Sequence, residues 1–213
     1  MKVYIAIGIS HPVLGEAVDN RLLSVRTNKQ IKDLNKKESF IWTMLSRNIY
    51  MYSEIVPEYI TFCENNNYDE FDLDAVLDRL ETGNLICAGH GVDIWTSLYD
   101  AFKKVVIIPR PSDFFLELIV FLKIFFSEKS IKTAMKIFNK GKKLTFDEKV
   151  ILDISRKARI SPAYIVDQLI HYEAETSTKT PEEFESFRLK RLSVLKSTAT
   201  LFINKHILFD LET

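Results

Sequence analysis

The histidines and cysteines are the first residues to consider for catalytic or metal-binding chemistry. The chain has four histidines, none at metal-ligand spacing from another: His11, His90, His171 and His206. Cys87 lies three residues before His90, but a tetrahedral zinc site requires a second pair and the sequence contains none. No local motif would activate the thiol of Cys63. We therefore predict a protein that is not an enzyme, with no catalytic residue, no metal ligand and no cofactor.

Acidic side chains gather before and within a helix predicted after residue 72. Six carboxylates lie between residues 64 and 78, without the ligand pattern and glycine of a calcium-binding loop: Glu64, Asp69, Glu70, Asp72, Asp74 and Asp78. In a DNA-binding helix-turn-helix unit the recognition helix enters the major groove, where carboxylates repel phosphate. Arg79 is the only basic residue on this helix. The N-terminal part is therefore predicted to be a poor DNA binder.

Basic side chains are concentrated in the second half of the chain. Residues 1–100 carry a net charge of −6, from 9 Lys/Arg against 15 Asp/Glu, and residues 101–213 carry +6, from 20 against 14. If the C-terminal part docks as a helix-turn-helix, its phosphate contacts would come from Arg156, Lys157, Arg188, Lys190, Arg191 and Lys196. A solvated, lysine-rich surface explains the same pattern. DNA binding by this part therefore stands as an alternative.

Short strands are predicted to open the chain. Apolar residues alternate from Val3 to Ile9, which indicates a strand that His11–Pro12 would end. Two further strands are predicted at 22–26 and 29–34, joined by a two-residue turn at Thr27–Asn28.

Three helices are predicted to follow these strands. Asn35 caps the first, with Glu38 completing a capping box, and Ser53 opens the second. Asp72 caps the third, whose apolar ladder is Leu73, Val76, Leu77 and Leu80. Gly83 is predicted to take the left-handed conformation after this helix. A strand at 85–87 and a tight turn at 89–91 complete a winged-helix order of elements.

The remainder of the chain is predicted to form a linker and a second group of three helices. A helix and a strand lie within 94–108, and Pro109–Pro111 marks a boundary. Phe114–Phe126 is apolar but too short to span a bilayer, and suits a buried helix or a homodimer interface. Capping patterns then open helices at Thr145, Ser161 and Thr180, and a strand is predicted at 207–209.

Part of the sequence is similar to a known family. Over residues 11–91 it resembles PqqD-like leader-peptide recognition domains, which are winged-helix units that bind peptides during ribosomal peptide maturation. The likeness rests on His11–Leu14, Val18–Val25, Asp33–Asn35, Phe40–Trp42, Asp74–Leu80 and Leu85–Ile86. The loop Asn65–Asp72 is longer than the compact pattern of the family. No resemblance covers residues 112–213.

The resemblance implies a mode of binding. In that family the leader peptide adds as an extra strand beside the third strand and lies against the third helix. Carried onto this chain, the peptide would contact Gln30, Ile31 and Lys32 on the strand, and Leu73, Val76, Leu77 and Leu80 near the groove. Strand addition draws its affinity from main-chain hydrogen bonds, and the charge of −6 favours a basic peptide.

Taken together, these patterns predict a mainly α (α+β) protein with tandem winged-helix-like units joined by an apolar helical linker. The predicted domains are 1–108, 109–143 and 144–213. We predict a peptide or protein partner for the first unit, with transcriptional regulation through DNA binding by the second unit as the alternative. Two cysteines and an N-terminus unlike a signal peptide favour a cytoplasmic location, without a membrane partner.

Overall fold

The computed structural model describes residues 1–12, 23–68, 71–110, 144–174 and 181–211, which form a mixed α and β structure. Within these residues, no helix has the length and apolar character needed to cross a bilayer. The predicted apolar segment Phe114–Phe126 and nearly all of the predicted linker lie outside the described residues.

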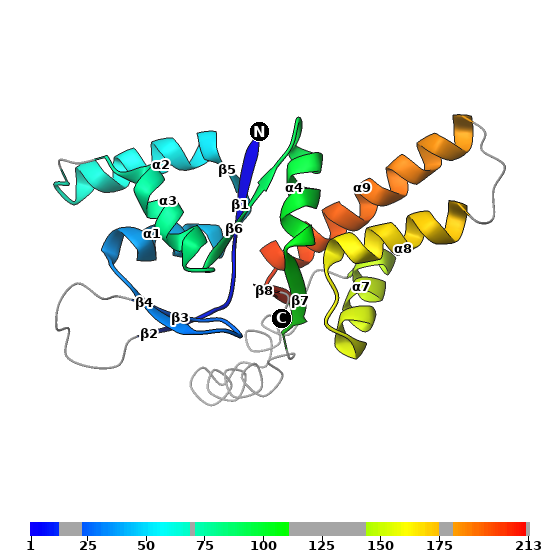
Figure 1. Cartoon of the computed structure of the whole chain (residues 1–213), viewed down its shortest axis with the longest axis horizontal. Coiled ribbons are helices and arrows are strands. Elements are labelled where there is room, and N and C mark those ends of the chain that lie inside the picture. The colour runs from blue at the N-terminus through cyan, green and yellow to red at the C-terminus, as the bar shows by residue number, and fades with distance from the viewer. Residues whose placement is uncertain (13–22, 69–70, 111–143, 175–180, 212–213) are drawn as a thin grey trace, which may run out of the picture.

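A small antiparallel sheet separates the two parts of the molecule (Figure 1). Its central strand is β1 (Lys2–Ala6), which pairs with β5 (Tyr50–Met51) on one side and with β6 (Ile86–His90) on the other. Successive side chains of a strand point to opposite faces. Tyr4 and Ala6 accordingly join one hydrophobic core, while Val3 and Ile5 join another.

Helices cover both faces of this sheet (Figure 1). On the face of Tyr4 lie α1 (Lys36–Leu45), α2 (Tyr52–Asn65) and α3 (Leu73–Thr82). On the opposite face lies α4 (Ile94–Lys103), which packs on β1 and β6. Both faces of β1 are therefore buried. One face contributes to the core with α1, α2 and α3, and the other contributes to the core that contains α4.

A second group of helices packs against α4. It contains α7 (Phe146–Lys157), α8 (Pro162–Ala174) and α9 (Pro181–Ile203), together with an antiparallel pair of β7 (Val105–Pro109) and β8 (Ile207–Leu211). The rings of Phe102 on α4, Phe202 on α9 and Phe209 on β8 meet in the core, with centroids 5.3 Å apart for Phe102–Phe209 and 4.9 Å for Phe202–Phe209. Residues 105–108, which we predicted to be the last residues of the first domain, pair with residues 208–211 of β8.

Each of the two helical groups contains one antiparallel strand pair whose members are far apart in sequence. In the N-terminal group β1 pairs with β6, and in the C-terminal group β7 pairs with β8; within the described residues, α7, α8 and α9 lie between the last two. In the N-terminal group, β5 lies between α1 and α2 in sequence and pairs with the side of β1 opposite β6. In the C-terminal group, Ile160 lies between α7 and α8, and its carbonyl accepts from the amide of Ile107 on β7 at 3.0 Å.

A second three-stranded sheet lies beside the N-terminal helices, in the order β2 (Ile9–Pro12), β3 (Leu23–Arg26) and β4 (Ile31–Leu34). The predicted break at His11–Pro12 is wrong, because both residues pair with β3. The break falls instead at Gly8, whose φ of 89° is a conformation that glycine adopts without strain. The turn after β3 spans Thr27–Gln30, where the amide of Thr27 donates to the carbonyl of Gln30 at 2.8 Å.

Most of the predicted helix starts are confirmed. Asn35 and Glu38 form a capping box on α1, and Thr145 and Glu148 form another on α7. The hydroxyl of Ser161 accepts from the amide of Tyr164 at the start of α8, at 3.1 Å. The second helix begins one residue earlier than predicted, at Tyr52.

Two predictions near the end of α3 are wrong. Gly83 has a φ of −73°, and Asn84, at φ 54°, takes the left-handed conformation instead. A tight turn was predicted at 89–91, but residues 89 and 90 belong to β6, because Gly89 pairs with Val3 and His90 with Lys2. Three residues then lead into α4, where Asp93 caps the helix by accepting from the amide of Thr96 at 2.7 Å.

Replacing Trp42 by phenylalanine is expected to lower the free energy of unfolding by about 1–2 kcal/mol, because a buried hydrogen-bond donor is lost. The indole N–H of Trp42 donates to the carbonyls of Ile7, at 3.2 Å, and Leu85, at 3.1 Å, and thereby joins α1 to the central sheet. Urea denaturation measures the change. Trp95→Phe is the control, because Trp95 is 38% exposed and its replacement is expected to change stability by less than about 0.5 kcal/mol. Equal losses in the two variants would contradict the assigned role.

Candidate functional site

Strand β4 has one open edge in the described part of the chain. It is the last strand in the order β2-β3-β4, and it pairs only with β3. Hydrogen-bonded and non-bonded residue pairs alternate in an antiparallel ladder. Because Thr27 and Gln30 form a bonded pair, the next pair along, Arg26 and Ile31, is non-bonded. The main-chain groups of Ile31 therefore face the open edge, and its side chain is 67% exposed.

A hollow of about 410 Å³ lies between β4 and the end of α3. It is lined by Lys32, Asp78, Arg79, Thr82 and Gly83. Glycine at position 83 leaves room for the side chain of Lys32, since a Cβ there would lie 2.8 Å from Lys32 Nζ. The side-chain amide of Gln30 donates to the carbonyl of Gly83 and ties the turn before β4 to α3. The structure therefore brings Gln30, Ile31 and Lys32 together beside α3.

The residues of α3 that line this hollow differ from those that the resemblance to PqqD-like domains implied. Side chains of the apolar ladder are at most 1% exposed and belong to the core: Leu73, Val76, Leu77 and Leu80. Asp78, Arg79 and Thr82, which lie on the exposed side of the helix, line the hollow instead. A ladder at i, i+3, i+4 and i+7 marks the buried stripe of a helix, so a ligand at the surface contacts the residues beside that stripe.

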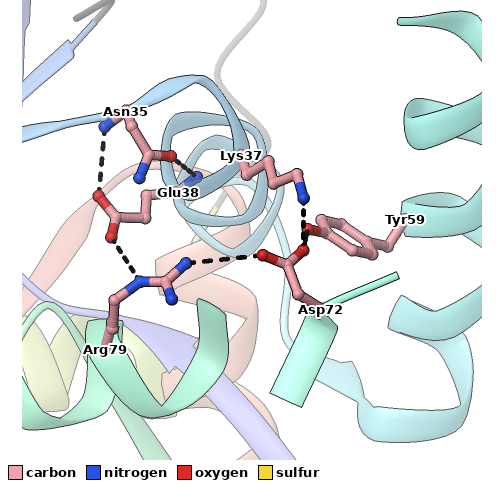
Figure 2. A network of polar contacts seen from close by, with 6 residues as sticks. All are labelled: Asn35, Lys37, Glu38, Tyr59, Asp72 and Arg79. Carbon is pink, nitrogen blue, oxygen red and sulfur yellow. Dashed lines mark hydrogen bonds and ion pairs between the residues drawn. The ribbon is translucent and has the colours of Figure 1, made fainter. Parts of the chain in front are cut away.

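A network of polar side chains holds the three N-terminal helices together (Figure 2). The carboxylate of Asp72 accepts from the hydroxyl of Tyr59 on α2, at 2.6 Å, and from Lys37 Nζ on α1, at 2.7 Å. Arg79 Nη2 lies 3.9 Å from the same carboxylate, and its Nε donates to Glu38 Oε1 at 3.2 Å. The network thus spans the start of α1, directly after β4, and the body of α3. It holds Arg79, which lines the hollow, against α1.

The protonation states in this network follow from its contacts. Burial of Asp72 opposes ionisation, but hydrogen bonds from Lys37 and Tyr59 outweigh it and hold the pKa of the carboxyl below its ordinary value. Burial, and then the hydrogen bond to Asp72, raise the pKa of Tyr59. At neutral pH a neutral hydroxyl therefore donates to a carboxylate, which is a strong type of hydrogen bond.

The role of Asp72 was only partly predicted from the sequence. It stands at the N-cap position of α3, but its side chain makes no capping hydrogen bond and serves the network instead. No polar contact was predicted for Tyr59, which is a buried residue of α2. A buried tyrosine hydroxyl needs a partner, and this is the signal that could have suggested a polar contact. Which carboxylate supplies that partner depends on the packing of α2 against α3.

The structure defines the surroundings of Cys63, Cys87 and His90. Cys63 and Cys87 are both free and buried. Burial raises the pKa of Cys87 to about 12. His90 is exposed at the end of β6. Across the described ranges, no group of three or more histidine, cysteine, aspartate or glutamate side chains is placed to hold a metal ion.

The basic residues proposed for DNA contacts have several structural settings. Arg191 stacks on Tyr99 of α4, with its guanidinium carbon 4.2 Å from the ring centroid. The hydroxyl of Tyr99 donates to Asp167 on α8, so this contact joins α4, α8 and α9. Two others pair with acidic residues three positions earlier, Arg156 with Asp153 and Arg188 with Glu185, while the rest are exposed: Lys157, Lys190 and Lys196. One of the six therefore has a role in packing between helices.

No protein-family model, curated protein or solved structure matches this chain. The resemblance to PqqD-like domains therefore stays a prediction from the sequence.

Proposed function

We propose that residues 1–91 form a winged-helix unit that binds a peptide by strand addition to β4. In this proposal the protein recognises a leader segment and presents it to a modifying enzyme during ribosomal peptide maturation, without catalysing a reaction itself. The second helical group is a further winged-helix-like unit, and the protein acts in the cytoplasm. The observation that carries the proposal is the open edge of β4, next to a hollow of about 410 Å³ that is lined by Lys32 of β4 and by residues at the end of α3.

The order of elements supports this proposal. Strands β2, β3 and β4 form a three-stranded sheet and precede α1, α2 and α3 along the chain. The resemblance implies that a peptide adds beside the third strand and lies against the third helix. In this chain the third strand of the small sheet is β4, and the third helix is α3. A free edge and a neighbouring helix are the two features that strand addition needs, because main-chain bonds give affinity and side-chain pockets give specificity.

The charges around the hollow change which kind of peptide we expect to bind. The net charge of the first hundred residues favours a basic peptide, but the hollow itself contains Lys32 and Arg79 together with Asp78. Arg79 is already paired with Glu38 and Asp72. A peptide side chain reaching the hollow therefore meets both signs of charge, and we propose a peptide of mixed charge.

The experiment is a titration of the isotopically labelled protein with peptides encoded beside its gene. Strand addition is expected to shift the amide resonances of Ile31, on the open edge of β4, and of Arg79, which lines the hollow. The variant Ile31→Pro removes the amide that faces the open edge without removing a bond to β3, and is expected to weaken binding by about tenfold or more.

The matched control is Ile31→Thr, which keeps both the amide and a β-branched side chain, and is expected to bind within about threefold of the original protein. Circular dichroism spectra of both variants test whether the fold is retained. Equal weakening in the two variants would indicate a contact with the isoleucine side chain and argue against strand addition. A peptide that binds without shifting either amide would disprove the proposed site.

The structural setting of the basic residues makes DNA binding the weaker of the two proposals. In the C-terminal group Arg191 is engaged with Tyr99. A mobility-shift assay at two salt concentrations separates the proposals, because phosphate contacts give a steep dependence on salt.

A further inference from the structure

A hollow of about 570 Å³ lies between β7 and the end of α7, in the C-terminal part of the molecule. Its lining combines an apolar strand segment with three arginines: Ile107, Ile108, Pro109, Arg110, Ser155, Arg156 and Arg159. Its volume is within the range of small-molecule sites, roughly 300–1,000 Å³. It is separate from the hollow beside β4, since the two share no residue.

The arginines of this hollow carry positive charge that is only partly neutralised. Arg156 forms an exposed ion pair with Asp153, at 3.2 Å. Among the described residues, no carboxylate lies within ion-pair distance of Arg110 or Arg159. Burial lowers the pKa of nearby Lys205, and the charges of Arg110 and Arg47 lower it further. Two exposed guanidinium groups are therefore available to an anion, in a region of unbalanced positive charge.

The main chain beneath these arginines is held in place. The amide of Arg110 donates to the carbonyl of His206, at 3.0 Å, and so continues the β7–β8 ladder by one residue. Arg159 precedes Ile160, whose carbonyl accepts from the amide of Ile107 on β7 at 3.0 Å. Both arginines therefore extend from anchored main-chain positions on opposite sides of the hollow, which reduces the cost of ordering them around a ligand.

We propose that this hollow binds a phosphorylated small molecule of about the size of a nucleotide. A guanidinium group presents a planar fork of N–H donors that matches two oxygens of a phosphate. Ile108 and Pro109, which are partly exposed, supply apolar surface for the part of the ligand that carries no phosphate. Of the six basic residues considered for DNA contacts, only Arg156 lines the hollow. A concave site of this volume suits a compact ligand better than a DNA duplex.

Isothermal titration with pyrophosphate, AMP and ADP tests the proposal, combined with chemical-shift mapping of the full-length protein. Binding of ADP is expected to shift the amides of Ile108 and Arg159. The variants Arg110→Gln and Arg159→Gln are each expected to raise the dissociation constant by about tenfold, and the double variant by more. Arg159→Lys keeps the charge but loses the planar fork, so an intermediate loss is expected.

The matched control is Arg26→Gln, which removes an exposed arginine of β3 that does not line the hollow. It is expected to bind ADP as the original protein does. An equal loss in this control would show that the effect is a general response to charge, and would overturn the site. So would a double variant that stays folded by circular dichroism and binds normally, or the absence of shifts with all three ligands. A short DNA duplex that shifts the same amides and binds more tightly than ADP would replace the small molecule as ligand.

Discussion

Replacing Gly89 by alanine is expected to lower the free energy of unfolding by about 3 kcal/mol, at the upper end of the range for overpacked cores. Gly89 lies on β6, where α4 crosses the central sheet. A Cβ at this position would lie 2.0 Å from the carbonyl oxygen of Ser97 and 2.6 Å from the amide nitrogen of Ala101. Both atoms belong to the main chain of α4, so the helix itself must move away from the sheet.

The position of α4 explains why this displacement has a large effect. Leu98, Ala101 and Phe102 are buried, and they belong to the core that α4 shares with β1 and the C-terminal helices. Moving α4 therefore disturbs the contact between the two parts of the molecule as well as one helix–sheet interface.

Urea denaturation measures the loss of stability for Gly89→Ala, and a thermal scan should show a melting temperature lower by roughly 6–12 °C for a chain of this length. The control is His90→Ala on the next residue of the strand, whose side chain is exposed; a change of less than about 0.5 kcal/mol is expected there. A loss below about 1 kcal/mol for Gly89→Ala would show that α4 adjusts easily, contrary to this account.

Replacing Asp72 by alanine is expected to lower the free energy of unfolding by about 2–3 kcal/mol, because the hydroxyl of Tyr59 and the ammonium group of Lys37 lose their acceptor. Tyr59 is fully buried, and its hydroxyl would be left without this partner. The side chain of Asp72 is 20% exposed, so the loss should stay below the cost of breaking a fully buried ion pair.

A double variant separates the hydrogen bond from the rest of the effect. Asp72→Ala combined with Tyr59→Phe removes both donor and acceptor, and is expected to recover part of the stability lost in Asp72→Ala alone. Glu64→Ala, which removes an exposed carboxylate of α2, serves as the control for charge. No recovery in the double variant would show that the hydroxyl of Tyr59 does not depend on Asp72.

The same network gives a pH dependence with a defined sign. The pKa of Asp72 in the folded protein lies below its ordinary value of 3.8. Its contribution to stability is therefore fully present above that value, and is lost as the pH falls through the pKa of the folded state. The stability difference between the original protein and Asp72→Ala should accordingly be constant at neutral pH and shrink in acid.

Asp72 also connects stability with the proposed peptide site. Arg79 lines the hollow beside β4 and is held by Glu38 and Asp72. A variant that loosens Arg79 should therefore alter the α3 wall of the hollow even where the fold persists. In the peptide titration, Asp72→Ala is the variant that tests whether this wall contributes to binding.

Local features of the structure were well predicted from the sequence. The capping boxes of α1 and α7 need only residues three positions apart, so the pattern Asn35 to Glu38 or Thr145 to Glu148 contains the whole interaction. The apolar ladder of α3 likewise identified its buried stripe. These predictions succeeded because the interacting groups are neighbours along the chain.

The candidate sites depend on contacts between distant parts of the chain. Lys37 and Asp72 are 35 residues apart, and Gln30 and Gly83 are 53 apart, so no local pattern pairs them. The arginine hollow likewise joins the end of β7 to the end of α7. The sequence identified Gln30, Ile31 and Lys32, but only the packing of α3 showed that Asp78, Arg79 and Thr82 lie opposite them.

The sequence by itself determined the starts of α1, α7 and α8 and the buried stripe of α3, because caps and hydrophobic periodicity are local properties. The tertiary structure alone decided that β6 continues through Gly89, because β1 pairs with it and α4 leaves no room there for a Cβ. It also decided that β4 keeps an open edge beside α3, because strand order arises from pairing across the chain.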